Sequence, residues 1–132
     1  MLSRLFKLLS LLILTNLLFA CSNMDEIELL DLQTMSYERA VRWGEFARAK
    51  SFHKDAPFLT DIERRRLKLY RVTDYSILQS RSPDPFNSYL IVEIKYYKND
   101  RPVIKSMTVK QHWKRKEDSD VWTLESPFPK FK

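Results

Sequence analysis

The fold is decided by the stretch YLIVEIKYYK, which covers residues 89–98. Side chains of an extended chain alternate between its two faces, and here the alternation is regular. One face is apolar and consists of Leu90, Val92, Ile94 and Tyr96. The other face is mixed and consists of Ile91, Glu93, Lys95 and Tyr97. The sequence therefore predicts a strand that places its apolar face against the core.

The residues after this strand continue a meander. Asn99 and Asp100 supply the turn of a hairpin, and residues 103–114 predict the returning strand. Its inward face is expected to consist of Val103, Met107, Val109 and Trp113. A second turn at 117–120 leads to a last strand at 121–125. An extended, proline-containing tail that carries Phe128 and Phe131 follows.

An earlier strand precedes the central one. Residues 69–79 are rich in Tyr, Val, Thr and Ile, but their alternation is imperfect, so a β-bulge is expected near Thr73 and Asp74. The next segment, 82–85, contains two prolines, which cannot donate hydrogen bonds to a sheet. That segment is therefore predicted to be a loop.

A helical pattern precedes the strands. Ser36 is predicted to be the N-cap of a long helix, because apolar residues recur at helical spacing from Tyr37 to Ala47. Gly44, the only glycine in the chain, falls within this helix, where glycine costs about 1 kcal/mol relative to alanine. We expect Gly44 to allow close approach to a sheet or an aromatic ring, and a hinge is the alternative. The sequence TDIE at 60–63 is a capping-box pattern and predicts a shorter helix that ends at about residue 67 or 69.

Together these elements predict an α+β domain. One long and one short N-terminal helix would cover one face of a curved, mostly antiparallel sheet of about four strands. The segments YERAVRWG (37–44), VEIKYY (92–97) and WTLESPFP (122–129), in this order, resemble small bacterial lipoproteins that carry an NTF2-like domain. The resemblance covers about residues 36–131 and implies a cone-shaped sheet. A cystatin-like helix-on-sheet arrangement is the neighbouring alternative.

The only cysteine, Cys21, ends an apolar N-terminal segment. A basic start with Arg4 and Lys7 precedes the apolar residues 8–18, an order that is typical of an export signal. The sequence LFAC at 18–21 resembles the lipobox of bacterial lipoproteins. In that family the signal is cleaved before the cysteine, here between Ala20 and Cys21, and the cysteine is acylated. The alternatives are a transmembrane anchor, for which the apolar segment is short, and a buried free cysteine.

This resemblance implies a division of the chain and an address. Residues 1–20 would be the signal peptide, 21–35 the lipidated cysteine and an acidic tether, and 36–132 the NTF2-like domain. Retention at the inner membrane is usually signalled by Asp after the cysteine, whereas Ser22 follows here and favours the outer membrane, facing the periplasm. An acylated Cys21 leaves no thiol for a disulfide, a redox motif or a metal site. We expect no cofactor and no metal.

Charge is distributed unevenly along the chain. Residues 22–35 hold four acidic residues and no basic one, whereas residues 36–132 hold 21 basic and 13 acidic residues, a net charge of +8. The acidic segment is also apolar enough that we expect it to dock partly on the domain. The predicted basic surface consists of Arg64, Arg65, Arg66 and Lys68, and a second basic group consists of Lys110, Lys114, Arg115 and Lys116.

These basic residues suggest what the domain could bind. Anionic phospholipid headgroups attract clustered Lys and Arg, so a membrane surface is one expected partner and an envelope protein is another. Nucleic acid is not expected, because the periplasm normally holds none. The alternative is a charged face that is simply solvated.

Enzymes of the NTF2-like superfamily hold acid–base groups such as Asp, His or Tyr inside the cone. By this resemblance the candidate catalytic residues are Tyr70, Asp74, Tyr75 and His112. A carboxylate at a strand edge is more often solvated, and His112 faces water if Trp113 faces the core. His53 falls in a polar loop between the helices, and the two histidines have no metal-type spacing. We therefore expect a non-catalytic binding or accessory module, with an isomerase- or dehydratase-like acid–base enzyme or a small apolar ligand binder as the alternative.

Overall fold

The computed structural model describes Met1, Leu2, Lys7 and residues 26–55 and 58–132. The predictions for the signal peptide, for cleavage at Ala20 and for Cys21 lie outside these residues. Within them the helices are α2 (Glu26–Arg42), α3 (Phe46–Lys50) and α4 (Asp61–Leu67). The strands are β1 (Tyr70–Asp84), β2 (Asn87–Lys98), β3 (Arg101–Arg115) and β4 (Trp122–Leu124). The strands form an open antiparallel sheet in the order β1-β2-β3-β4, so the predicted α+β class is confirmed.

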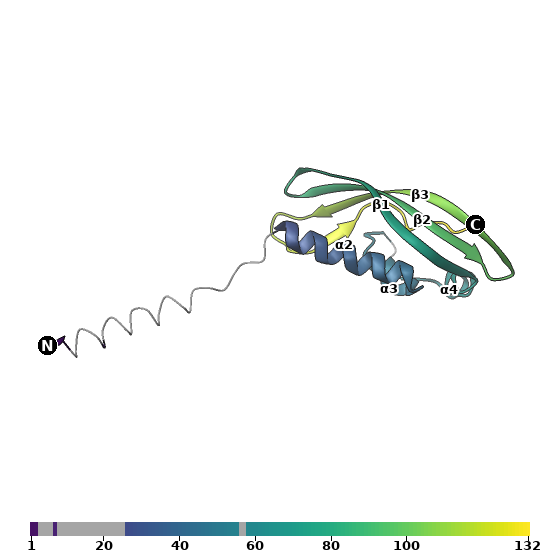
Figure 1. Cartoon of the computed structure of the whole chain (residues 1–132), viewed down its shortest axis with the longest axis horizontal. Coiled ribbons are helices and arrows are strands. Elements are labelled where there is room, and N and C mark those ends of the chain that lie inside the picture. The colour runs from purple at the N-terminus through teal and green to yellow at the C-terminus, as the bar shows by residue number, and fades with distance from the viewer. Residues whose placement is uncertain (3–6, 8–25, 56–57) are drawn as a thin grey trace.

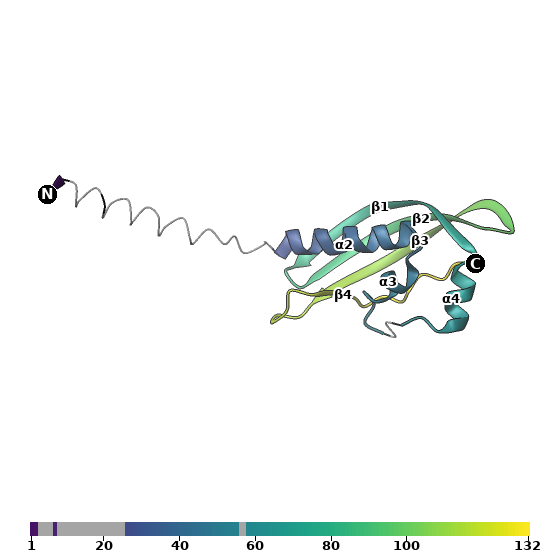
Figure 2. The ribbon, with the colours of Figure 1, turned by 90° about the horizontal axis from the view of Figure 1, so that it is seen from below.

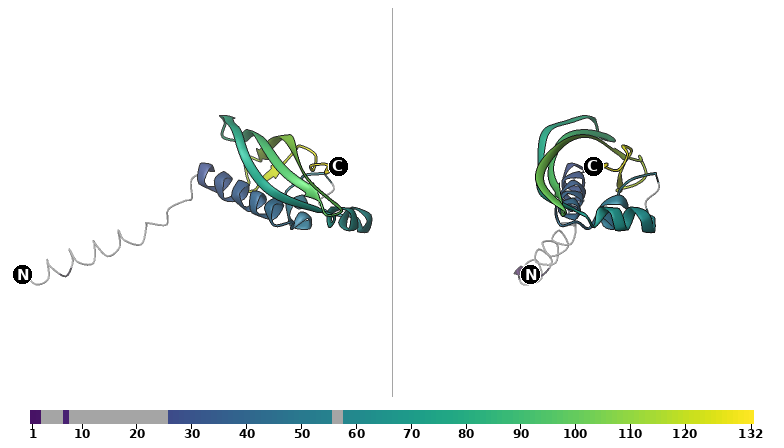
Figure 3. Two further views of the ribbon diagram at one scale, coloured as in Figure 1. Left: turned by 45° about the vertical axis from the view of Figure 1, so that its right-hand side comes forward. Right: turned by 90° about the vertical axis from the view of Figure 1, so that its right-hand side faces the viewer.

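The helices lie along one side of the sheet (Figure 1). Figure 2 shows α2 running beside the strands, with α3 next to its C-terminal turns and α4 farther along. Viewed along the long axis, the sheet curls around α2 and the C-terminal segment (Figure 3). Side chains fill this concave face: Tyr37, Trp113 and Phe131 are each at most 1% exposed. The Tyr37 and Trp113 rings meet edge to face with centroids 5.7 Å apart, a geometry that aromatic pairs favour.

The strands follow the predicted alternation at the centre of the sheet. The apolar face of β2 lies in the core, as predicted, and consists of Leu90, Val92, Ile94 and Tyr96. On β3 the prediction is correct for Trp113, which is buried, and for Met107 and Val109, which are partly buried. Val103, expected on the same face, is exposed. The reason is its position near the β2–β3 turn, which extends past the helices in Figure 2.

Strand β1 has the predicted bulge but continues further than expected. Its register against β2 shifts between Val72 and Asp74, at the expected position. The predicted loop at 82–85 is wrong in part, because β1 continues to Asp84 and includes Pro83. Proline is tolerated here because β1 is an edge strand and its register shifts again between Arg81 and Asp84.

The long helix differs from the prediction at both ends. It begins at Glu26 and not at Ser36, so residues 26–35 of the predicted acidic tether belong to α2. Part of this acidic segment docks, as expected. Leu30 packs against the core, and the Oε1 atom of Gln33 accepts a hydrogen bond of 2.9 Å from the backbone N–H of Trp122.

Gly44 separates α2 from α3, whereas the sequence predicted that it lies inside one long helix. Its φ of +71° lies in the left-handed region, which glycine enters without the steric cost of a Cβ. The N–H of Gly44 donates to the carbonyl of Val41 at 3.2 Å, and that of Glu45 donates to Ala40 at 2.8 Å. This pair of bonds is a Schellman motif, which ends a helix. The break changes the buried face, so Ala47 is exposed and Ala49 is buried.

The ends of the domain agree more closely with the sequence. Helix α4 begins at the predicted capping box, in which Thr60 Oγ1 accepts from the N–H of Glu63 and the Glu63 carboxylate accepts from the N–H of Thr60. Strand β4 lies within the predicted 121–125. The C-terminal tail packs on the core, where Phe131 is buried and Phe128 is partly buried. These two rings therefore do not form an exposed apolar patch.

Candidate functional site

A surface hollow of about 370 Å³ lies where α3, α4 and the start of β1 meet. Its floor contains the buried side chains of Phe46 and Leu67 and the half-buried side chain of Leu59. Its exposed basic lining residues are Arg48, Arg64, Lys68 and Arg71. The hollow thus joins an apolar floor to a basic rim, a combination that suits a ligand with an anionic group and an apolar part.

Local sequence explains how the two helices are positioned around the hollow. The Schellman turn at Gly44 directs α3 away from the line of α2, and the capping box starts α4 at Asp61. The two helices are then joined by an ion pair, in which Lys50 Nζ lies 2.9 Å from Glu63 Oε1. Hydrogen bonds from the backbone and hydroxyl of Thr60 and from Lys50 lower the pKa of Glu63 to about 2. Glu63 therefore stays ionised, and the contact between α3 and α4 persists at neutral pH.

The charges that line the hollow are unbalanced. Glu45 is the only acidic residue among the described ones that line it, and its carboxylate is already 2.9 Å from Nη1 of Arg48. Arg71 donates from Nη1 to the backbone carbonyls of Lys68 and Tyr70, both at 3.2 Å. Within residues 26–55 and 58–132, the side chains of Arg64 and Lys68 make no hydrogen bond or ion pair. Arg64 and Lys68 therefore have no polar partner in the described part of the protein, and Arg71 has only carbonyl partners there.

The structure divides the basic surface predicted from sequence into two pairs. The four predicted basic residues are exposed, as expected, and come from α4 and its C-cap: Arg64, Arg65, Arg66 and Lys68. Only Arg64 and Lys68 line the hollow. They stand four residues apart and so share one helix face. Arg48 and Arg71 complete the rim, and the sequence pattern did not group them with α4 because they come from α3 and β1.

The second basic group does not form one surface. Arg115 is buried, with its guanidinium carbon 4.9 Å from the centre of the Phe86 ring and Nη1 donating to the Ser119 carbonyl at 3.2 Å. Lys114 and Lys116 line another hollow, whereas Lys110 lines a third one beside the C-terminal tail. The predicted grouping is therefore wrong for Arg115, because alternate residues of β3 point to opposite faces and Arg115 lies on the buried one.

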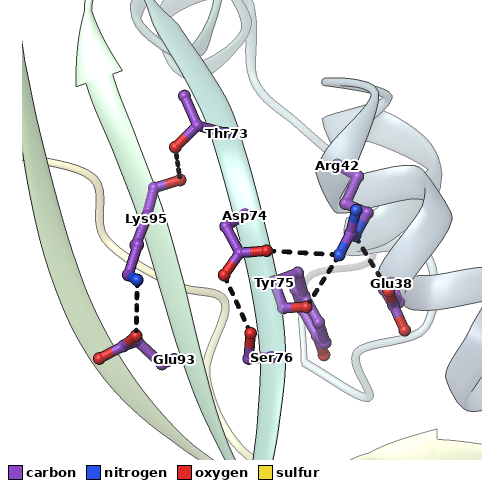
Figure 4. Close-up of polar contacts among 8 residues, drawn as sticks. All are labelled: Glu38, Arg42, Thr73, Asp74, Tyr75, Ser76, Glu93 and Lys95. Carbon is purple, nitrogen blue, oxygen red and sulfur yellow. Dashed lines mark hydrogen bonds and ion pairs between the residues drawn. The ribbon is translucent and has the colours of Figure 1, made fainter.

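Asp74 lies in a half-exposed ion pair (Figure 4). Its Oδ1 atom is 3.5 Å from Nη2 of Arg42, and its Oδ2 atom accepts a hydrogen bond of 2.9 Å from Ser76. The same Nη2 atom donates to the backbone carbonyl of Tyr75 at 3.1 Å. Arg42 thus ties the end of α2 to the bulge of β1. The Asp74 side chain is 39% exposed, so it does not occupy the apolar pocket in which a carboxyl group becomes a base.

The two tyrosine candidates are buried in the core. The Tyr75 hydroxyl accepts a hydrogen bond of 2.9 Å from Nε2 of Gln111, whose Oε1 atom accepts from Trp113 Nε1 at 3.1 Å. Burial raises the pKa of the Tyr75 hydroxyl. The Tyr70 ring packs against Tyr96, with centroids 6.0 Å apart. These contacts place the two rings in packing and hydrogen-bond roles within the sheet.

His112 lies away from the other candidates, on the opposite face of β3 from buried Trp113. Its ring stacks on Tyr89 with centroids 4.4 Å apart, and its Nε2 atom is 2.8 Å from Oδ1 of Asn87. The register pairs His112 with Tyr89 and Tyr89 with Arg81, seven residues along β1 from Asp74. Seven residues of strand span about 23 Å. The structure therefore does not bring His112 and Asp74 together.

His53 is buried, with 4% of its surface exposed, although the sequence predicted that it falls in a polar loop. Its Nδ1 atom is 2.7 Å from the carbonyl oxygen of Ser126. A carbonyl can only accept, so Nδ1 carries the proton and Nε2 accepts from the Tyr37 hydroxyl at 3.1 Å. Burial is the largest influence on the ring and lowers the pKa of His53. Both ring nitrogens are therefore used inside the protein.

A backbone pairing with β4 holds the segment around His53 against the sheet. The N–H of Leu124 donates to the carbonyl of Phe52 at 2.8 Å, and the N–H of Lys54 donates to the carbonyl of Leu124 at 2.9 Å. Local sequence around His53 carries no strand pattern, so no local signal could have revealed this pairing.

Among the described residues, no group of three or more His, Cys, Asp or Glu side chains could hold a metal ion. In the same part of the chain, no helix combines the length and apolarity needed to cross a bilayer. Comparison with protein-family models, curated proteins and solved structures finds no match to this chain.

Proposed function

We propose that the protein is a non-catalytic binding or accessory module of the bacterial cell envelope, held at a membrane by acyl chains on Cys21. One observation carries the proposal. Cys21 is the only cysteine, it ends the lipobox-like sequence LFAC, and it lies five residues before Glu26, where α2 begins. Anchoring by two or more acyl chains is stable, whereas a single chain binds a membrane only marginally.

The early start of α2 brings the domain close to this anchor. A fully extended chain spans at most about 3.5 Å per residue, so five residues reach no further than about 18 Å. If the whole segment from residue 21 to 35 were extended, it would reach about 50 Å by the same measure. The shorter distance supports a domain that meets lipid headgroups or an envelope protein directly at the membrane surface.

The non-catalytic part of the proposal rests on the concave face of the sheet. We take the NTF2-like cone as the proposed finer description of the fold, and the curl of the sheet around α2 supports it. Aromatic side chains fill this face, and Asp74 and His112 lie far apart. The alternative, an acid–base enzyme or a binder of small apolar ligands, would need an open pocket in the same place.

The proposed address is the outer membrane, facing the periplasm, because Ser22 follows Cys21 in place of Asp. The membrane is then a partner through acylated Cys21 and through anionic headgroups, and an envelope protein is the proposed second partner. Nucleic acid is not proposed as a partner, since the protein would be exported.

Replacement of Cys21 tests the anchor. In a Gram-negative host that expresses the full chain, Cys21→Ser should abolish incorporation of labelled palmitate and should leave the signal peptide attached, which mass spectrometry detects. Ser22→Ala is the matched control and should keep both the label and the processed mass. Unchanged labelling and unchanged mass in the Cys21→Ser variant would overturn the proposal.

A second substitution tests only the address. Ser22→Asp should move the acylated protein from the outer to the inner membrane, as measured by density-gradient fractionation. If the acylated protein with Ser22 is found at the inner membrane, the outer-membrane assignment is overturned, whereas the proposal that Cys21 is acylated is unaffected.

A further inference from the structure

We infer that the hollow between α3, α4 and β1 binds an anionic amphiphile, a molecule in which a phosphate or carboxylate group is joined to an alkyl chain. This inference goes beyond anchoring through Cys21, because it concerns the folded domain and a separate molecule. It rests on the charge, the spacing and the floor of the hollow.

The first support is the excess of positive charge. Among the described residues, four cationic side chains and one carboxylate line the hollow, and the carboxylate of Glu45 is engaged by Arg48 at 2.9 Å. Arg48 also donates from Nη2 to the hydroxyl of Ser36 at 2.7 Å, so its position is held from two sides. An anion that enters the hollow therefore meets an uncompensated positive field, in which charge-assisted hydrogen bonds are favoured.

The second support is the spacing of the two cations that have no partner in the described protein. Arg64 and Lys68 lie at positions i and i+4 of α4 and its C-cap, where like charges repel each other. Neither side chain makes a polar contact with the described part of the protein, so no contact within the fold accounts for the two charges. An anion bound between them would convert this repulsion into two attractive contacts.

The third support is the floor. Phe46 and Leu67 present apolar surface at the base of the hollow, and Leu59 adds to it from the segment before α4. A simple inorganic anion would leave this surface in contact with water. An alkyl chain covers it, and burial of apolar surface is favourable in proportion to its area.

The segments around the hollow also carry large apolar side chains that are exposed. Phe58 and Ile62 are 83% and 72% exposed. Apolar and aromatic side chains beside Lys and Arg are typical of surfaces that contact lipids. The same chemistry fits two sources of ligand, a phospholipid of the membrane that holds the protein or a free amphiphile in the surrounding solution.

The chain offers a selective reporter for this site. Gly44 lines the hollow and is the only glycine in the sequence. Labelling with [15N]glycine therefore gives a single backbone amide signal, and this signal comes from the lining of the hollow. The mature protein would be held in nanodiscs of phosphatidylcholine and titrated with hexyl phosphate. We expect a saturable shift of the Gly44 signal. Inorganic phosphate and hexyl glucoside, which lack the chain or the charge, should each bind at least about tenfold more weakly.

Two double variants separate a defined site from general attraction by charge. Arg64→Gln with Lys68→Gln removes the two cations that line the hollow, whereas Arg65→Gln with Arg66→Gln removes two neighbours on the same helix that do not. The first pair should weaken hexyl phosphate binding by about tenfold or more, since hydrogen bonds to charged groups are the stronger kind. The second pair should change the affinity less than about threefold.

Three results would overturn the inference. They are an absence of any saturable shift, an equal loss of affinity in the two double variants, and an equal affinity for inorganic phosphate and hexyl phosphate. The Gly44 signal reports on the domain whether or not Cys21 is acylated, because an unacylated chain can be titrated free in solution. Failure here would therefore leave the anchor proposal standing, and the reverse is also true.

A last comparison identifies the source of the ligand. Nanodiscs that contain phosphatidylglycerol should shift the Gly44 signal without any soluble probe if the ligand is a membrane lipid, and the Arg64/Lys68 double variant should lose that shift. A response to hexyl phosphate but not to phosphatidylglycerol nanodiscs would support a free amphiphile as the ligand.

Discussion

The polar centre around His53 and the basic hollow beside α4 treat their charged or titratable groups in opposite ways. At His53 every ring nitrogen has a partner within the protein, with Tyr37 on one side and the carbonyl of Ser126 on the other. At the hollow, Arg64 and Lys68 are exposed and have no polar partner among the described residues. The fold itself supplies the hydrogen-bond partners of His53, whereas in the proposed site a bound ligand supplies those of Arg64 and Lys68.

This difference teaches how stability and binding are separated in a small domain. A buried polar group that loses its partner costs about 1–3 kcal/mol, so the fold can be expected to depend on His53. An exposed cation without a partner contributes little to the free energy of unfolding. Arg64 and Lys68 should therefore be replaceable without unfolding the protein, whereas residues of the His53 centre should not.

The largest effect is expected from His53→Phe. The variant keeps a ring of similar shape but leaves the Tyr37 hydroxyl and the Ser126 carbonyl unpaired, so the free energy of unfolding should fall by about 3 kcal/mol. Urea denaturation followed by circular dichroism measures it. The matched control is His112→Phe at the only other histidine, which is half-exposed and should cost less than about 1 kcal/mol. An equal loss of unfolding free energy in the two variants would contradict the prediction that the buried hydrogen bonds of His53 stabilise the fold.

A smaller effect is expected from pH. Because the pKa of His53 is lowered in the folded protein, the unfolded chain takes up the proton more readily below about pH 6.5. The free energy of unfolding should therefore fall between pH 7 and pH 5, by at most about 1.4 kcal/mol per pH unit for one proton. The contribution of Glu63, whose pKa is lowered to about 2, is lost only at more acidic pH. The His53→Phe variant should lose the slope between pH 7 and 5, and a slope retained in that variant would contradict the assignment.

The smallest effect is expected from the two cations of the hollow. Arg64→Gln with Lys68→Gln should change the free energy of unfolding by less than about 0.5 kcal/mol, and the change should be an increase because repulsion at i and i+4 is removed. Lys50→Gln is the contrasting variant, since Lys50 is buried and pairs with Glu63 at 2.9 Å. Thermal denaturation should rank Lys50→Gln as the less stable protein. A loss greater than 1 kcal/mol in the double variant would mean that these side chains support the fold.

Local patterns were sufficient to predict the central sheet and the start of α4. Alternation in 89–98 places alternate side chains on the core face because a strand has a period of two, whatever lies beyond it. The capping box at Thr60 satisfies backbone groups of its own helix. Both depend on neighbours a few residues away, and both are found in the structure.

The helix boundaries show where local patterns fail. Ser36 has the chemistry of an N-cap, yet it lies inside α2, because Leu30 packs on the core and Gln33 binds the backbone of Trp122. Apolar residues continue at helical spacing across Gly44, so the period gives no sign that the helix ends there. The left-handed turn at Gly44 becomes visible only when the positions of α2 and α3 are known.

The sequence by itself determined the class of the fold, the strand alternation, the capping of α4 and the lipobox-like setting of Cys21, because each depends on residues adjacent in the chain. Only the tertiary structure decided that His53 is buried, that Asp74 pairs with Arg42, and that Arg64 and Lys68 meet Arg48 and Arg71 around one hollow. These outcomes join residues from separate helices and strands. Burial and electrostatic partners depend on distance in space, which no local period encodes.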